Sequence, residues 1–263
     1  MKKILPAERC FNHRKRILEI SQKVKAIHVG GSFSSVEIID SLYFSLMKSK
    51  DHFVLSKGHC GILLYTILEA AKILKKNEVD SYCKFNSKLG VHPELTTKGV
   101  ETSTGSLGHG LAIAAGMALS NKLNKSKGNI YVLMSDGEMM EGSVWEAALF
   151  IGSKKINNLI AIVDNNDLQS ATSNKDTHPN LLPIHKKFKN FGWESETCNG
   201  HNVIEIINKI SKRSKKKPFL LVAKTKKGFP VSYMKNKPIW HYRSPNKEEL
   251  LIALSDLEEL KRE

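Results

Sequence analysis

Cysteine is scarce in this sequence, and none is placed for cross-linking. The 263-residue chain has four, which lie far apart and form no CxxC pair: Cys10, Cys60, Cys83 and Cys198. A chain of this length can bury enough apolar surface to fold without disulfide bonds. The cysteine pattern therefore excludes a disulfide-rich secreted scaffold and indicates a reducing compartment.

Long apolar runs are also missing. No stretch approaches the roughly 18 uninterrupted apolar residues of a membrane span. The charged start Met-Lys-Lys is not followed by the apolar core of a secretory leader. We therefore expect a cytoplasmic protein with no membrane partner.

Arginine is sparse although the chain is strongly basic, with 41 Lys and Arg against 26 Asp and Glu and a formal net charge of +15. The arginines are Arg9, Arg14, Arg16, Arg213, Arg243 and Arg262. Proteins that read nucleic acids favour the bidentate guanidinium group over lysine. The pattern, which includes a dense basic run at 212–217, therefore favours a solvated lysine-rich surface over specific nucleic-acid binding.

Apolar residues are plentiful, and their spacing predicts an α/β fold. Three apolar runs of strand length lack polar alternation, at 130–134, 159–163 and 219–223. Such runs are typical of strands that are buried on both faces. Segments of helical period separate them, so we expect a parallel sheet with helices on both faces.

The other expected elements are one short strand, at 53–55, and a set of helices. Capping-box pairs mark the starts of two of these helices, Ser34 with Glu37 and Asn246 with Glu249. The helices are expected at 8–27, 34–48, 61–74, 110–123, 142–151, 203–210 and 247–262. No repeat or low-complexity linker divides the chain.

Polar residues follow two of the predicted strands, where ligands of open α/β sheets bind. Asp136 and Gly137 follow the first run, and Asn166 follows the second. Mg²⁺ prefers one or two carboxylates together with phosphate oxygens and water. Asp136, Asn166 and the Leu168 carbonyl form a candidate metal site, and Gly137 would let a diphosphate approach the backbone. An ordinary strand-ending turn followed by a loop explains the same residues equally well.

Five histidines occur in polar or glycine-flanked contexts, namely His28, His59, His92, His109 and His241. Loop histidines can converge on one site, where they donate to phosphate oxygens or carry protons near neutral pH. Taken singly, each is more simply an ordinary loop histidine. No histidine or cysteine cluster has zinc spacing, and no Gly-x-Ser-x-Gly elbow follows a strand.

Five segments together resemble transketolase, in the order in which that family has them. They are Leu-Ser-Lys-Gly-His at 55–59, Val-His-Pro-Glu at 91–94, the loop 99–108, Ser-Asp-Gly-Glu-Met-Met-Glu-Gly at 135–142 and Asp-Asn-Asn at 164–166. The resemblance runs from about His28 to His241. It implies a thiamine diphosphate-binding fold, with residues 1–263 as one diphosphate-binding domain and about 225–263 as an extension packed on it.

The resemblance also implies roles for single residues. Asp136, Asn166 and the Leu168 carbonyl match the ligands of a divalent cation, Mg²⁺ or else Ca²⁺ or Mn²⁺. The residues matching the diphosphate site are Gly137, His59 and His241, and those matching the aminopyrimidine loop are Gly105, Ser106 and Leu107. The residues matching the donor-ketose site are His28 and His92, with His241 beside them in the active site. Glu141 matches a glutamate at the dimer interface that links two active sites.

Two small departures and one large one separate the chain from a complete transketolase. Ser135 stands where the family usually has Gly, and Ser106 where many members have Pro. The glutamate that protonates the aminopyrimidine belongs to a second domain, for which no segment is left over. The resemblance therefore implies a split enzyme, inactive alone, that pairs with a C-terminal subunit carrying the pyrimidine-binding domain, as an α₂β₂ heterotetramer.

Other assignments stay open. The first subunit of a 2-oxoacid dehydrogenase shares the cofactor and the split organisation, although segments 91–94 and 139–142 favour transketolase. A 1-deoxyxylulose-5-phosphate synthase-like enzyme is a further relative, and its chain is normally unsplit. A non-catalytic protein that keeps a degenerate fold is the alternative from another class, and nucleic-acid binding is a minor one.

The distribution of arginine bears on the substrate. None lies between Arg16 and Arg213, so an arginine clamp for a sugar phosphate cannot come from the middle of the chain. Lysine could serve, the sugar could be unphosphorylated, or the partner subunit could supply the clamp, which we favour. The excess positive charge would then complement a more acidic partner.

Overall fold

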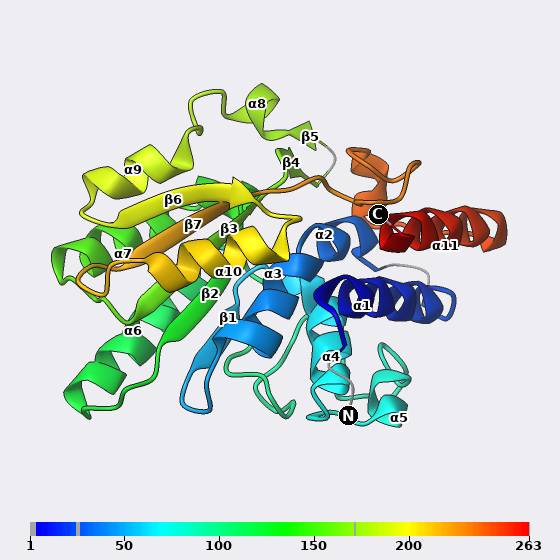
Figure 1. Ribbon diagram of the computed structural model, residues 1–263, viewed down its shortest axis with the longest axis horizontal. Helices are drawn as coiled ribbons and strands as arrows, with labels where there is room; N and C mark the ends of the chain where they lie inside the picture. Colours follow the sequence, from blue (N-terminus) through cyan, green and yellow to red (C-terminus); the bar gives the residue numbers. More distant parts are fainter. Residues whose placement is uncertain (1–3, 25–26, 171, 263) are drawn as a thin grey trace.

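The computed structural model describes residues 4–24, 27–170 and 172–262. Its centre is a five-stranded sheet in which every pair of neighbouring strands is parallel, in the order β1-β2-β3-β7-β6 (Figure 1). The strands are β1 (His52–Leu55), β2 (Ile130–Ser135), β3 (Leu159–Asn165), β6 (Glu194–Asn199) and β7 (Phe219–Lys224). All five carboxyl ends therefore lie at one edge of the sheet.

Both faces of the sheet are buried, as the unbroken apolar runs predict. Alternate side chains of β2 enter two different cores, with Tyr131 and Leu133 in one and Val132 and Met134 in the other. Parallel strands with period-two side chains and helices on each face produce this division. The predicted α/β class is confirmed.

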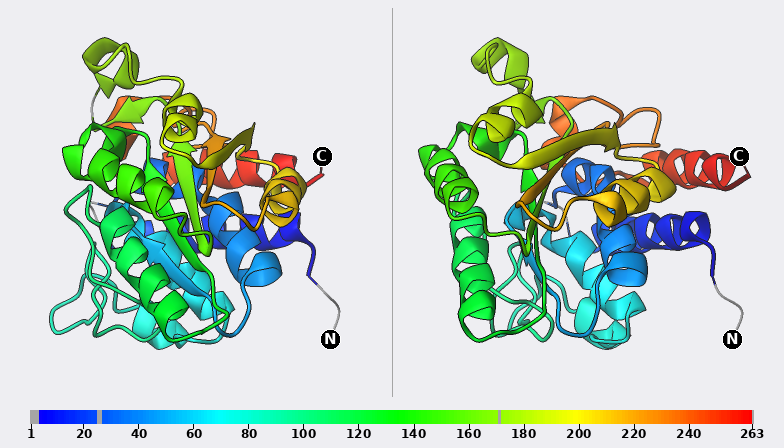
Figure 2. Two further views of the ribbon diagram at one scale, coloured as in Figure 1. Left: turned by 90° about the vertical axis from the view of Figure 1, so that its left-hand side faces the viewer. Right: turned by 60° about the vertical axis from the view of Figure 1, so that its left-hand side comes forward.

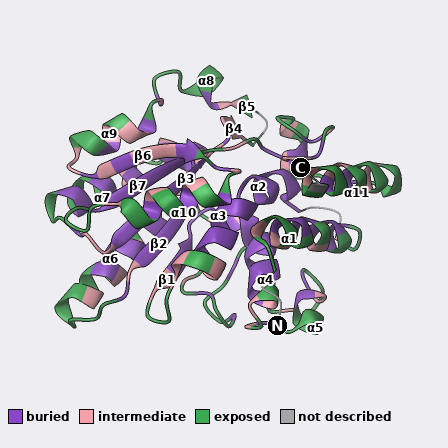
Figure 3. Cartoon of the chain, viewed as in Figure 1, coloured by how far each residue is buried: buried purple, intermediate pink, exposed green. Residues whose placement is uncertain are grey.

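Helices cover the sheet in two layers (Figure 2). One core is shared with α6 (Gly110–Leu123), α7 (Gly142–Ser153) and α9 (Ile184–Asn190). The other is shared with α1 (Pro6–Ser21), α3 (Val36–Ser41), α4 (Gly61–Ala70) and α10 (Val203–Lys212). In Figure 3 the helices on the outside expose one side and bury the other, as amphipathic helices do.

Shorter elements connect these layers. The short helices are α2 (Val29–Ser34), α5 (Lys76–Val79) and α8 (Asn174–Thr177), with a π-helical turn at Leu42–Leu46 and 3₁₀ turns at Gly58–Cys60, Gly137–Met140 and Pro238–His241. A small antiparallel pair is formed by β4 (Leu168–Gln169) and β5 (Thr172–Ser173). The last helix, α11 (Lys247–Arg262), lies against α1. No helix in the described part of the chain is long and apolar enough to cross a membrane.

One capping prediction is confirmed and the other is wrong. Asn246 and Glu249 exchange side-chain to backbone bonds of 2.8 Å at the start of α11. Ser34 instead ends α2, and its hydroxyl donates to Gly31 and Asp164. The expected helix 34–48 is present in shorter form, as α3 followed by the π-helical turn, and it has no side-chain cap. Glu37 forms an ion pair with Arg14.

Two further element predictions need correction. The first helix ends at Ser21 and not at residue 27, and residues 25 and 26 lie outside the described residues. Strand β6 is absent from the expected elements, because its sequence Glu-Ser-Glu-Thr-Cys-Asn has no apolar run. It lies at the edge of the sheet, where such side chains can reach solvent.

Candidate functional site

Strand register brings the polar residues after β2 and β3 together. Ser135 pairs with Asp164, so Asp136 lies beside the chain that follows Asp164. The buried Asp136 carboxylate accepts from the backbone N–H groups of Gly137 (2.9 Å) and Asp167 (2.6 Å). It also accepts from the Asn165 amide, at 3.2 Å. The carboxyl edge thus holds a buried carboxylate in a cage of donors.

The residues at this edge fit a hard cation. Burial, and secondly the nearby Asp164 carboxylate, raise the pKa of Asp136 to about 7, so its charge lacks full compensation. Asp136, the Asn166 carboxamide and the Leu168 carbonyl offer only oxygen atoms and a single negative charge, which suits Mg²⁺ that keeps phosphate oxygens as ligands. The described residues contain no cluster of three or more His, Cys, Asp or Glu able to hold a metal.

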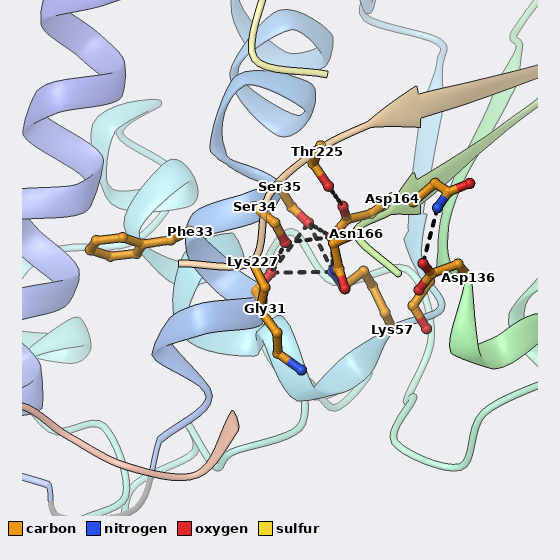
Figure 4. A network of polar contacts seen from close by, with 12 residues as sticks. Gly31, Phe33, Ser34, Ser35, Lys57, Asp136, Asp164, Asn166, Thr225 and Lys227 are labelled. Atoms are coloured by element: carbon orange, nitrogen blue, oxygen red, sulfur yellow. Dashed lines mark hydrogen bonds and ion pairs between the residues drawn. The ribbon is translucent and has the colours of Figure 1, made fainter. Parts of the chain in front are cut away.

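A second buried carboxylate, Asp164, is compensated from within the chain (Figure 4). It forms an ion pair with the fully buried Lys57 and accepts from the hydroxyl of Thr225. The hydroxyls of Ser34 and Ser35 donate to it at 2.6 and 2.8 Å. Burial alone would raise the pKa of Asp164, but Lys57 and these donors hold it below its usual value.

Lys57 and Asp164 lie within the sequence motifs, yet the sequence predicts no role for either. They are 107 residues apart and the pairing depends on the fold. Burial would lower the pKa of Lys57, but Asp164 outweighs that effect and raises it. The pair crosses from the end of β1 to the end of β3, so it joins the strands on either side of Asp136.

Four of the five candidate histidines do converge. The His28 ring centroid is 5.3 Å from that of His59, 6.4 Å from His92 and 4.9 Å from His241. The fifth, His109, is exposed at the start of α6.

Burial and nearby cations keep three of these imidazoles neutral. Burial, then His92 and Lys227, lower the pKa of His28 to about 4. Burial, then Lys227, lower the pKa of His241 to about 3, and burial holds the pKa of His59 well below its ordinary value. Each can therefore donate one hydrogen bond and accept another at neutral pH.

Lys227 is a site residue that sequence reasoning missed. Its ammonium lies 2.8 Å from Nδ1 of His241 and the side chain is buried. Burial, and secondly Lys57, lower its pKa to about 8. Among so many lysines nothing marks it, except that it follows the carboxyl end of β7 and precedes Gly228.

These groups surround a cleft of about 260 Å³ at the carboxyl edge. Of the residues predicted for the site, those that line it are His28, His59, His92, Gly105, Leu107, Gly137, Asn166, Leu168 and His241. Lys57, Lys227 and Tyr242 line it as well. Gly105 has a φ of +153°, and a Cβ there would lie 3.0 Å from Cγ of His92, so the loop requires glycine.

Three residues that the sequence predicts for the site do not line the cleft. Asp136 is buried next to Ser135 and Gly137, which line the cleft. Ser106 is exposed at the edge of the Gly105–Leu107 loop. Glu141 is exposed at the start of α7, where its side chain lies against Gly108, the residue after Leu107.

A parallel sheet with this carboxyl edge defines the class of the protein as a thiamine diphosphate-binding α/β fold, and comparison with known proteins agrees. The chain belongs to the transketolase family: residues 12–252 match the family described as transketolase, thiamine diphosphate binding domain. The fold superposes on transketolase from Campylobacter jejuni with a TM-score of 0.89 at 27% identity, over 97% of this chain and 43% of that one.

Its curated relatives fall into two length classes. An apulose-4-phosphate transketolase subunit of Phocaeicola vulgatus is 38% identical over 94% of this chain and 92% of its own length. A 6-deoxy-6-sulfo-D-fructose transketolase subunit of a Clostridium species is 35% identical over 93% of both chains. Human transketolase is 36% identical over 81% of this chain, which spans only 36% of that longer protein. The two relatives above that match this chain over more than nine-tenths of their own length are named as subunits.

Proposed function

We propose that this chain is the diphosphate-binding subunit of a split transketolase that moves a two-carbon ketol unit from a ketose phosphate to an aldose phosphate. The supporting observation is the cleft, in which an oxygen-donor set, neutral histidines and Lys227 surround one small volume at the carboxyl edge. Residues 1–263 would act as one diphosphate-binding domain, with 225–263 packed on it.

Asp136, the Asn166 carboxamide and the Leu168 carbonyl would hold Mg²⁺, or Ca²⁺ or Mn²⁺, against the cofactor's diphosphate. Thiamine diphosphate would supply the carbanion chemistry of ketol transfer. Gly137 would let the diphosphate approach the backbone, because it lines the cleft and has no side chain. A Cβ at this position would also lie only 3.0 Å from Cβ of Gln169.

His59, His241 and Lys227 would contact the diphosphate end of the cofactor. Lys227 is positioned by its contact with Nδ1 of His241, which leaves the other ring nitrogen of that histidine for a ligand. Gly105 and Leu107 would form the wall beside the aminopyrimidine, with Ser106 on the outer side of the same loop.

His28 and His92 would bind hydroxyl groups of the donor ketose. Nδ1 of His28 is buried and has no hydrogen-bond partner among the described residues, so a hydroxyl in the cleft would satisfy it. A neutral imidazole suits an uncharged hydroxyl, because it can accept or donate without placing a second cation beside Lys227.

The remaining parts of the site would come from a partner. We propose a C-terminal transketolase subunit that carries the pyrimidine-binding domain, assembled as an α₂β₂ heterotetramer, with the exposed Glu141 at an interface between subunits. That partner would also supply contacts to the sugar phosphate. The four cysteines are all free, which suits the cytoplasm as the compartment.

Reconstitution tests this proposal. The chain alone, the partner alone and an equimolar mixture of the two are each given thiamine diphosphate and Mg²⁺, with either a ketose phosphate and an aldose phosphate or pyruvate. We expect turnover of the sugar pair by the mixture alone. Turnover by the isolated chain would contradict the split enzyme, and turnover of pyruvate would indicate a 2-oxoacid dehydrogenase component.

A further inference from the structure

Another pocket lies at the opposite, amino edge of the sheet, beside the loops that precede β1, β2, β3 and β7. Its volume is about 530 Å³, within the range of small-molecule sites. Five cations from three loops line it, namely Lys48, Lys50, Lys127, Arg213 and Lys215. Two of them belong to the basic run at 212–217, which the cleft does not use.

Hydrogen bonds join the loops around this amino-edge pocket. The Asp51 carboxylate accepts from the backbone N–H groups of Lys48 (2.9 Å) and Asn129 (2.7 Å). The Arg213 guanidinium donates to the Asn129 side chain at 3.3 Å. The Asn157 amide donates to the Lys215 carbonyl at 2.7 Å, which adds the loop before β3. The pocket wall is therefore held together across the starts of β1, β2, β3 and β7.

The positive charge of this pocket is not neutralised by the chain. Asp51 is the only acidic residue in the lining, and backbone groups already occupy its carboxylate. Across the described residues, no ion pair involves any of the five cations. Nε of Arg213 is buried and lacks an acceptor there. The other guanidinium nitrogens donate to the neutral Ile210 carbonyl and Asn129 side chain, so the charge of Arg213 has no counterion among the described residues.

We infer that the amino-edge pocket binds a small phosphorylated anion, at a site separate from the cofactor cleft. The guanidinium of Arg213 would bind phosphoryl oxygens, and the lysines would surround them as point charges. The strands are six or seven residues long between the two edges at β2 and β3, so about 20 Å separates this site from the cleft. Both sites could therefore be occupied together.

Calorimetric titration of the full chain with glycerol 3-phosphate tests this inference, with glycerol as the uncharged control. We expect binding of the phosphate alone. Arg213→Gln and the double variant Lys50→Gln/Lys215→Gln should each weaken it about tenfold, because charge-assisted bonds are lost. Lys216→Gln removes the same charge from the same run outside the pocket lining, and should change affinity by less than about twofold.

Other outcomes would overturn the site. Absence of binding, or equal weakening by Lys216→Gln, would leave only a diffuse positive surface. Weakening by Lys227→Gln with full affinity in Arg213→Gln would place the anion in the cleft. Tight, strongly salt-dependent binding of a single-stranded oligonucleotide without binding of glycerol 3-phosphate would indicate a nucleic-acid surface. The side chains of Lys50 and Lys215 make no hydrogen bond within the described residues, so their loss tests the ligand and not the fold.

Discussion

At the carboxyl edge of the sheet Lys57 is buried against Asp164, whereas at the amino edge Lys50 and Lys215 are exposed and have no acidic partner among the described residues. The two edges share strands and draw on the same kinds of side chain. Burial separates them: a buried cation needs a permanent counterion, while an exposed one can remain in water.

The carboxyl edge also contains a contrast of its own. Asp164 and Asp136 are both fully buried carboxylates at the ends of neighbouring strands. Lys57 holds the pKa of Asp164 low, whereas burial and Asp164 itself raise that of Asp136. Asp164 is therefore neutralised by a cation of the chain, whereas Asp136 is suited to binding a cation from outside it.

Asp164→Asn should have the largest effect on folding. It leaves Lys57 buried without its counterion, and breaking a buried pair in this way costs about 3–5 kcal/mol. Urea denaturation at pH 7.5 measures the loss. Asp176→Asn removes the same charge from an exposed position on α8 and should leave the midpoint unchanged. An Asp164→Asn chain as stable as the parent would mean that the pair does not hold the edge together.

Asp136→Asn should affect cofactor binding more than folding, the opposite of Asp164→Asn. Without ligands it should lower stability at pH 7.5 by less than Asp164→Asn does. It removes a buried charge that no cation of the chain pairs with, although its amide NH₂ group replaces one oxygen that accepts hydrogen bonds. In the reconstituted pair it should weaken Mg²⁺-dependent binding of thiamine diphosphate roughly a hundredfold, or about 2.7 kcal/mol, by removing a cation ligand. Calorimetry measures the affinity, with Asp176→Asn again as control. Unchanged cofactor affinity would assign Asp136 to the scaffold, as for Asp164.

The histidines of the cleft predict acid sensitivity. The pKa of His28 is about 4 in the folded chain against an ordinary value of 6.5, so the unfolded chain alone takes up the proton as the pH falls between these values. The contribution of His28 to stability is full above pH 6.5 and declines toward pH 4. His28→Gln should remove about 3 kcal/mol of that decline, as measured by denaturation across the range. His109→Gln, at an exposed position, should leave the loss of stability between pH 6.5 and 4 unchanged. If His28→Gln loses as much stability over this range as the parent chain, His28 is not the source of the acid sensitivity.

Sequence predicts the central strands well, because β2 and β3 are buried on both faces and their apolar runs are unbroken. It also predicts that Asp136 and the segment 164–167 lie at one edge, since parallel strands place their carboxyl ends together. At that edge Asp136 bonds with Asn165 and Asp167, whereas the Asn166 amide donates to Asp164. It fails for β6, whose edge position tolerates the polar residues Glu194 and Glu196. Local pattern cannot show which side of a strand will face solvent.

The missed site residues share one cause. Ser34 fits a capping box locally, but its hydroxyl bonds with Asp164, 130 residues away. No local sequence pattern distinguishes Lys57 and Lys227 from the other lysines, and only the fold shows that they are buried. Sequence thus predicts which loops meet, and the fold alone determines which charges within those loops are paired.

A substitution at the amino edge should have the smallest effect on the free energy of unfolding, and that effect should depend on salt. Lys50, Lys127 and Lys215 surround one pocket and repel one another through water. Lys215→Glu places an acid among them and should raise the free energy of unfolding by a few tenths of a kcal/mol at low salt, the usual scale for exposed pairs. Because the Debye length is about 3 Å at 1 M salt, that gain should vanish there. Lys235→Glu, outside the pocket, should give no comparable gain. A Lys215→Glu gain that persists in 1 M salt would show that packing, and not repulsion between exposed cations, distinguishes this edge from the buried pair at the other.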